Sequence, residues 1–138
     1  MNHHRGVLVT RKRDGSLQMS PVSPAVDEEG RVIISSRETA YKTKNICRDS
    51  RVSLCEFTDA FHGSSWIQIN GNAEVLPLPE AMEPLVDWNR RVKGEHSNWS
   101  EYRETMKRQR RKGRQVRRNR KIFFFAVLAS WRDEEKIG

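Results

Sequence analysis

The chain has 138 residues, the size of one domain with a single hydrophobic core. Hydrophobic residues make up 36% and charged residues 32%, so we expect a core beneath a strongly charged surface. No apolar run approaches the ~20 residues that a membrane-spanning helix needs, the first residues lack the apolar stretch of a secretory signal, and two cysteines cannot form a disulfide framework. These observations predict a cytoplasmic protein with no membrane partner.

The net charge of +8 comes from a single segment. Residues 107–121, KRQRRKGRQVRRNRK, contain ten cations and no acid, and removing these ten leaves 16 of the 26 Lys and Arg against 18 Asp and Glu. Three interpretations are open: the segment binds nucleic acid, it is a solvated helix and linker, or it helps to hold an anionic cofactor tail. The absence of aromatic residues within it disfavours the binding of single-stranded nucleic acid.

Six segments have the composition of β-strands. They are rich in β-branched or aromatic residues and are bounded by turn residues such as Asp, Gly and Pro. The expected strands are residues 6–12, 17–26, 31–36, 51–57, 66–76 and 122–131. Most of them follow one another through short turns, which favours antiparallel pairing, because parallel neighbours need a long crossover. The sequence therefore predicts a mainly β fold, a small six-stranded antiparallel barrel with short helices.

Three features refine these elements. The dipeptide Asp14-Gly15 is typical of a tight hairpin turn, and Pro21 and Pro24, which have no N–H, predict an edge position or a bulge for residues 17–26. We expect helices over residues 37–49, 79–92 and from 97 onward. Pro84 predicts a kink in the second helix, and Ser97 is the expected N-cap of the third.

A phosphate-binding site is predicted where the third strand meets the first helix. Ser35 and Ser36 offer hydroxyl groups, the helix start is electropositive, and Arg37, Lys42 and Lys44 add positive charge within ten residues. We expect the two lysines to share the exposed side of the helix. Alternation along the second strand places Gln18 and Ser20 on one face of that strand.

Three stretches together resemble the pyridoxamine 5'-phosphate oxidase-like split β-barrel family. They are GVLVTRKRDGSLQMSPVSPAVDEEGRVIISSRETAYKTKNICRDSRVSL, then WIQINGNAEVLPLPEAMEPL, then GEHSNWSEYRETM. The nearest branch is the one whose small proteins use the deazaflavin coenzyme F420 where relatives use FMN. The resemblance covers about residues 5 to 110 in unbroken order. It departs from the family pattern at Ala40, where many relatives have Arg. It departs again after RETM, where RKGRQVRRNRK intervenes before the last strand and the ending is unlike the family pattern.

The resemblance implies a six-stranded FMN-binding split barrel that forms a homodimer with two equivalent cofactor sites at the subunit interface. It implies that the cofactor phosphate is bound by Ser35, Ser36, Arg37, Lys42, Lys44 and Asn45. It also implies that the cofactor ring lies near Gln18, Met19, Ser20, Pro21, Trp66 and Gln68. We expect residues 1–106 to form the split-barrel cofactor-binding domain, 107–121 the basic segment, and 122–138 the last strand and tail, which would close the barrel.

The expected function is that of an F420-dependent oxidoreductase, with hydride transfer to a small conjugated or heteroaromatic substrate. The alternatives are an FMN-binding oxidase or reductase of the same fold, a non-catalytic cofactor carrier, and a nucleic-acid-binding protein that uses residues 107–121. No catalytic side chain is identified, and His3, His4, His62 and His96 do not have the spacing of a metal site. No acidic residues pair convincingly for acid–base catalysis, which is consistent with hydride chemistry, because the cofactor then carries the reaction.

Overall fold

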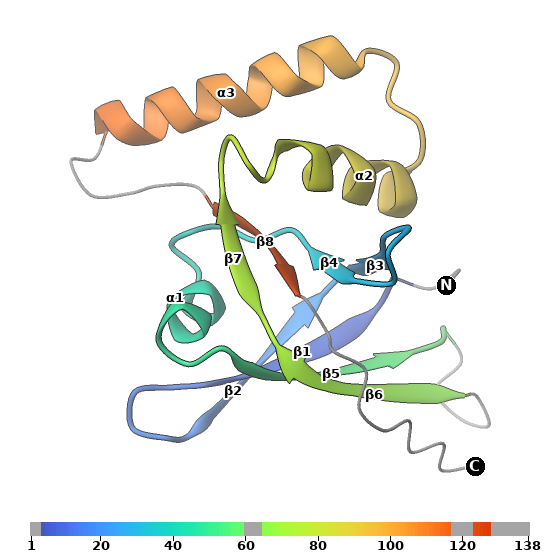
Figure 1. Cartoon of the computed structure of the whole chain (residues 1–138), viewed down its shortest axis with the longest axis vertical. Helices are drawn as coiled ribbons and strands as arrows, with labels where there is room; N and C mark the ends of the chain where they lie inside the picture. Colours follow the sequence, from blue (N-terminus) through green and yellow to red (C-terminus); the bar gives the residue numbers. More distant parts are fainter. Residues whose placement is uncertain (1–3, 60–64, 117–122, 128–138) are drawn as a thin grey trace.

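The computed structural model describes residues 4–59, 65–116 and 123–127, which form two four-stranded antiparallel sheets and three helices (Figure 1). Sheet A has the strand order β2-β1-β5-β6 and contains β1 (Gly6–Arg11), β2 (Leu17–Val22), β5 (Arg51–Phe57) and β6 (Trp66–Asn72). Sheet B has the order β3-β4-β8-β7 and contains β3 (Pro24–Val26), β4 (Val32–Ile34), β7 (Glu74–Pro77) and β8 (Phe123–Val127). The helices are α1 (Tyr41–Arg48), α2 (Met82–Lys93) and α3 (Trp99–Val116).

The first hairpin confirms the turn predicted at Asp14-Gly15. Gly15 has a φ of 84°, in the left-handed region that glycine adopts without a steric penalty. The Asp14 carboxylate accepts hydrogen bonds from the Ser16 N–H at 3.0 Å and the Ser16 hydroxyl at 2.6 Å. The Lys12 N–H donates to the Ser16 carbonyl at 2.8 Å and closes the turn. The register that follows pairs Arg11 with Leu17.

Two of the six predicted strands are divided in the structure, so its described residues form eight strands. The predicted strand 17–26 leaves sheet A at Ser23 and continues in sheet B as β3, because Pro24 fixes φ and has no N–H. The Ser23 carbonyl accepts a hydrogen bond from the Trp88 indole on α2 at 2.8 Å. The predicted strand 66–76 bends in the same way at Ala73, whose N–H donates to Ser50 O at 2.8 Å. The architecture is a mixed α+β fold with antiparallel sheets, and the closed six-stranded barrel stays a prediction.

The main core lies between the sheets and is completed by α1. Alternate residues of β1 and β5 point into it, as their burial patterns show. Its buried members come from both sheets and one helix: Leu8, Val32, Ile34, Ile46, Val52, Leu54, Ile69 and Ala73. A second cluster of Leu78, Ala81, Met82 and Leu85 lies under α2, with Met106 of α3 packed against it. The two longer helices therefore gather at one end of the molecule (Figure 1).

Two helix predictions are wrong in detail. Pro84 lies in the first turn of α2, where its missing N–H has no intrahelical partner to lose, so α2 is one continuous helix over Met82–Lys93. The cap of α3 is Asn98 and not Ser97, because the Asn98 side-chain oxygen accepts the Glu101 N–H at 3.0 Å. The side chains of Arg103 and Glu83 then join α3 to α2 through two hydrogen bonds of 3.0 Å.

The basic segment is helical over its described part, because α3 continues to Val116. Its last five residues, the end residues predicted for the last strand, and the tail lie outside the described residues. The described part of that strand, β8, pairs with β4 on one side and β7 on the other. Over the described ranges, no helix combines the length and the apolar character needed to cross a bilayer.

Candidate functional site

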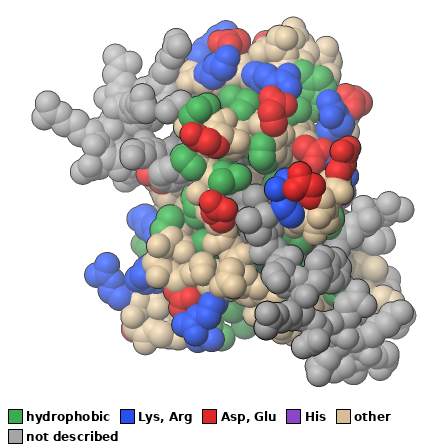
Figure 2. Space-filling model, viewed as in Figure 1, with side chains coloured by type: hydrophobic (Ala, Val, Ile, Leu, Met, Phe, Trp, Pro, Cys, Tyr) green, Lys and Arg blue, Asp and Glu red, His purple; other side chains and the backbone are tan. Residues whose placement is uncertain are grey.

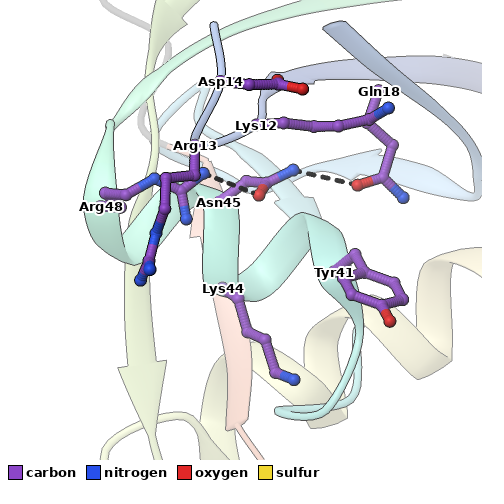
Figure 3. A pocket seen from close by; sticks show the side chains of 8 residues that line it. All are labelled: Lys12, Arg13, Asp14, Gln18, Tyr41, Lys44, Asn45 and Arg48. Atoms are coloured by element: carbon purple, nitrogen blue, oxygen red, sulfur yellow. Dashed lines mark hydrogen bonds between the residues drawn. The ribbon is translucent and has the colours of Figure 1, made fainter. Parts of the chain in front are cut away.

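A hollow of about 790 Å³ lies between the β1–β2 turn and α1. It is lined by Lys12, Arg13, Asp14, Gln18, Tyr41, Lys44, Asn45 and Arg48 (Figure 3). In the space-filling view, Lys and Arg side chains gather at the corner that α1 and this turn occupy in Figure 1 (Figure 2). The hollow is therefore built where two segments that are distant in the sequence meet.

The lining is strongly cationic. Lys12 and Arg13 come from the turn, and Lys44 and Arg48 come from α1, against the single carboxylate of Asp14. The Ser16 hydroxyl and N–H both donate to that carboxylate and hold its pKa below the ordinary value. Four cations around one acid create a positive potential, so the hollow favours an anionic ligand.

Asn45 is the centre of a buried polar network at the wall of the hollow. Its side-chain nitrogen donates to Thr10 Oγ1 on β1 at 3.0 Å and to Gln18 Oε1 on β2 at 2.9 Å. Its Oδ1 accepts a hydrogen bond from Arg48 Nη2 at 2.9 Å, and the same nitrogen donates to the Arg11 carbonyl at 2.8 Å. Asn45 is only 5% exposed, so this network holds α1 against the hairpin.

Lys42 and Lys44 do not share one side of α1, which corrects the prediction. Residues two apart on a helix project about 200° apart around its axis. Lys44 lines the hollow, with its ammonium 5.4 Å from the centre of the Tyr41 ring. Lys42 lies outside that lining and is half-buried, and this burial lowers the pKa of its ammonium. The other predicted anchors, Asn45 and Lys44, do meet at the hollow.

The residues predicted before the helix are placed differently. The helix begins at Tyr41, so Ser35, Ser36 and Arg37 precede its first turn by several residues. The Ser36 hydroxyl is buried and lies 3.1 Å from Thr43 Oγ1, which itself donates to the Arg37 carbonyl at 2.8 Å. Ser35 is half-buried and Arg37 exposed, and neither lines the hollow. Their predicted role in binding phosphate stays a prediction.

The residues predicted near the cofactor ring occupy two faces and two edges of sheet A. Gln18 and Ser20 point inward, and Ser20 is 8% exposed, whereas Met19 and Pro21 point outward. Trp66 is on β6, at the opposite edge of the sheet from β2. With ~4.8 Å between neighbouring strands, three spacings place these edges about 14 Å apart.

Gln68 is likewise on β6, where its side-chain nitrogen donates to Asn70 Oδ1 at 3.0 Å. Within this chain, the side chains of the six predicted ring residues therefore do not all come to one place.

Five of the eight residues that line the hollow were not predicted as site residues. They are Lys12, Arg13, Asp14, Tyr41 and Arg48. A signal was available, because the first strand becomes cationic immediately before the turn at Asp14. In the described parts of the chain, no group of three or more His, Cys, Asp or Glu side chains is arranged to hold a metal ion.

The model of the family described as pyridoxamine 5'-phosphate oxidase matches residues 2–120. A conserved hypothetical protein from Mycobacterium tuberculosis has a similar structure, with a TM-score of 0.71, 21% identity, and coverage of 96% of this chain and 77% of that one.

Two further structures are similar at lower identity. An F420 reductase gives a TM-score of 0.60 at 17% identity, covering 92% of this chain and 86% of its own. The heme storage protein HutZ from Vibrio cholerae gives 0.68 at 12% identity, covering 97% and 86%. At these identities the neighbours establish the fold alone.

Proposed function

The chain belongs to the pyridoxamine 5'-phosphate oxidase family, and from this premise we propose that it is an F420-dependent oxidoreductase acting on a small conjugated or heteroaromatic molecule. The bound deazaflavin would supply the hydride. FMN is the alternative cofactor, since both carry a phosphate group. A structural neighbour described as an F420 reductase favours the deazaflavin.

The observation that carries this proposal is the cationic hollow between the β1–β2 turn and α1. Lys12, Arg13, Lys44 and Arg48 present only hydrogen-bond donors, which suit the acceptor oxygens of a phosphate or carboxylate. Both kinds of group occur in F420, which carries a phosphate and several glutamates. The role of these four side chains is to bind and orient the anionic part of the cofactor.

We propose that the protein acts as a homodimer through the outer face of sheet A. This face carries large apolar side chains that are unusually exposed for a soluble protein: Leu17 is 52% exposed, Met19 69% and Trp66 42%. A second copy packed on this face would bring its β6 edge toward the β2 edge of the first. The outward-pointing members of the predicted ring set, Met19 and Pro21 of one subunit and Trp66 and Gln68 of the other, would then meet across the interface.

A split barrel is the architecture that we propose for the two sheets. β2 continues into β3 at one margin, and β6 continues into β7 at the other, so each sheet passes into its neighbour at both edges. Counted this way, the eight described strands would make up the six long strands of the proposed barrel. This arrangement leaves the hollow at one end of the proposed barrel, beside α1.

The test is a binding titration of F420 and of FMN with the wild-type protein and two variants. The double variant Lys12→Ala/Lys44→Ala should weaken cofactor binding by ~10-fold or more, because two charged contacts are lost. Lys93→Ala is the matched control, since this exposed lysine lies on α2 beside the Trp88 ring, outside the lining of the hollow and outside the basic segment. Equal affinity in all three proteins would refute the hollow as the cofactor site. If the wild-type protein binds FMN more tightly than F420, FMN becomes the proposed cofactor.

Lys42→Ala in the same titration tests the phosphate site predicted from the sequence. Because Lys42 lies outside the lining of the hollow, we expect a smaller loss of affinity than for the double variant. A larger loss of affinity would indicate that the phosphate group binds near residues 35–37 and Lys42, as the sequence predicts, and not in the hollow.

A cofactor carrier is the second candidate function, favoured by the structural likeness to a heme storage protein. A carrier would bind F420 or FMN without turnover, so steady-state reduction of conjugated substrates distinguishes the two. The nucleic-acid alternative rests on the basic segment, of which α3 forms the described part. It predicts duplex affinity that falls steeply with salt and disappears when residues 107–121 are deleted.

A further inference from the structure

We propose that Arg48 and Asn45 fix the side-chain amide of Gln18 so that its N–H groups face the hollow, which makes Gln18 a specificity-determining donor for an oxyanion. This inference rests on the proposed function of the hollow as an anion site.

The orientation begins at Arg48, whose guanidinium has donors and no acceptor. Its Nη2 approaches Asn45 at 2.9 Å and the Arg11 carbonyl at 2.8 Å. The atom of Asn45 facing this nitrogen has to be the oxygen, because an amide nitrogen there would bring two donors together. Arg48 therefore determines the orientation of the Asn45 amide.

With its oxygen directed at Arg48, Asn45 presents its nitrogen to the hairpin. The two N–H groups of this nitrogen have two acceptors, Thr10 Oγ1 at 3.0 Å and Gln18 Oε1 at 2.9 Å. Both donors of a residue that is 5% exposed are thus satisfied. The Gln18 atom that faces Asn45 is accordingly the oxygen.

The Gln18 nitrogen is left on the side turned away from Asn45 (Figure 3). Gln18 is half-buried and lines the hollow, and within the described residues its side-chain nitrogen makes no hydrogen bond of its own. Two N–H donors are therefore available to a ligand. The nearby cations Lys44 and Arg48 are also donors, so the ligand group beside Gln18 has to be an acceptor.

Because only donors surround this position, it favours the oxygens of a phosphate or carboxylate over neutral groups that are hydrogen-bond donors. A ligand donor placed beside Gln18 would meet another donor and would lose a hydrogen bond on leaving water. Gln18 is thereby assigned to the anionic part of the cofactor, because its side chain points inward, away from the outer face of sheet A.

A double-mutant cycle with inorganic phosphate as the probe tests the relay. In Asn45→Asp the new carboxylate only accepts, so Gln18 has to turn its nitrogen toward residue 45 and its oxygen toward the hollow. Gln18→Met removes the amide altogether. The added negative charge of Asn45→Asp acts in both backgrounds, whereas the reversal of the amide acts only where Gln18 is present.

We expect Asn45→Asp to weaken phosphate binding by ~5-fold or more in excess of the factor that it causes in the Gln18→Met background. The same factor in both backgrounds would overturn the relay. Calorimetry at constant ionic strength measures the four affinities. A wild-type protein that binds no phosphate would overturn the oxyanion specificity, whereas failure to reduce substrates with phosphate binding intact would overturn only the enzymatic proposal.

Side-chain amide NMR of the wild-type protein tests the same relay without any substitution. The Asn45 amide protons should be protected from exchange with solvent, because both are donated within the protein. The Gln18 amide protons should exchange rapidly and their signals should shift when phosphate is added. Protected Gln18 protons that do not respond to phosphate would refute the assigned orientation.

Discussion

The carboxyl group of Glu56 is buried, and one of its two oxygens has no hydrogen-bond partner among the described residues. Glu56 lies on β5, opposite Gly6 of β1 and Ile67 of β6, and is 5% exposed. Its Oε2 accepts no hydrogen bond within the described part of the chain. Burial raises its pKa from 4.5 to about 7, although the positive charge of His4 opposes this shift. Replacing Glu56 with Gln keeps the shape and removes the ionisation.

The sign of the pH dependence follows from the raised pKa. The native protein keeps the Glu56 proton up to about pH 7, whereas the unfolded chain releases it near 4.5. The carboxyl therefore stabilises the fold most at low pH, and this stability is lost as the pH rises from about 4.5 through 7. A shift of this size corresponds to at most about 3 kcal/mol, and we expect about 2 kcal/mol between pH 5 and pH 8 because water relaxes around the charge.

Urea denaturation at pH 5 and pH 8 measures this effect. The stability of Glu56→Gln relative to wild type should increase by about 2 kcal/mol from the lower to the higher pH. Ile69→Val is the control, because this buried core residue does not titrate and its replacement should cost about 0.5–1.5 kcal/mol at both pH values. A stability difference for Glu56→Gln that is the same at pH 5 and pH 8 would refute the reasoning.

Three other substitutions test the fold by the same denaturation assay. Gly15→Ala should cost about 1–2 kcal/mol from backbone strain at φ 84° alone, since its new methyl group would contact nothing within 4 Å; no loss would mean that the turn has another geometry. Trp88→Phe should cost about 1–3 kcal/mol because it leaves the Ser23 carbonyl without its donor, and a neutral effect would exclude that bond. Glu83→Gln breaks the ion pair with Arg103 and should cost less than about 1 kcal/mol, a difference that 1 M salt should abolish.

Much of the local structure could be predicted from neighbouring residues in the chain. The pair Asp14-Gly15 determines its own turn through the positive φ of the glycine and the short reach of the aspartate side chain. Alternation along residues 51–57 predicts β5 and its buried face, because a strand side chain can only point to one side or the other. Such features depend on contacts within a few residues.

The errors occurred where a distant contact competes with the local pattern. The strand predicted over residues 17–26 divides at Ser23, where a tryptophan from α2 takes the carbonyl. The Asn45 side chain is likewise hydrogen-bonded to three residues of β1, β2 and α1 that the local pattern does not indicate, and its role in binding phosphate stays a prediction. The local sequence pattern does not predict such partners, since they come from distant parts of the chain.

By itself, the sequence determined the antiparallel strands with their turns and the presence of cations near the first helix, because these depend on composition, periodicity and short-range geometry. The family came from the resemblance to known sequences, which the family model over residues 2–120 bears out. The tertiary structure alone decided which cations meet. Lys12 and Arg13 lie beside Lys44 and Arg48 only because the buried network around Asn45 holds α1 against the hairpin. About 30 residues of chain separate Arg13 from Lys44. The local sequence pattern therefore does not predict which side chains of the hairpin and α1 pack together.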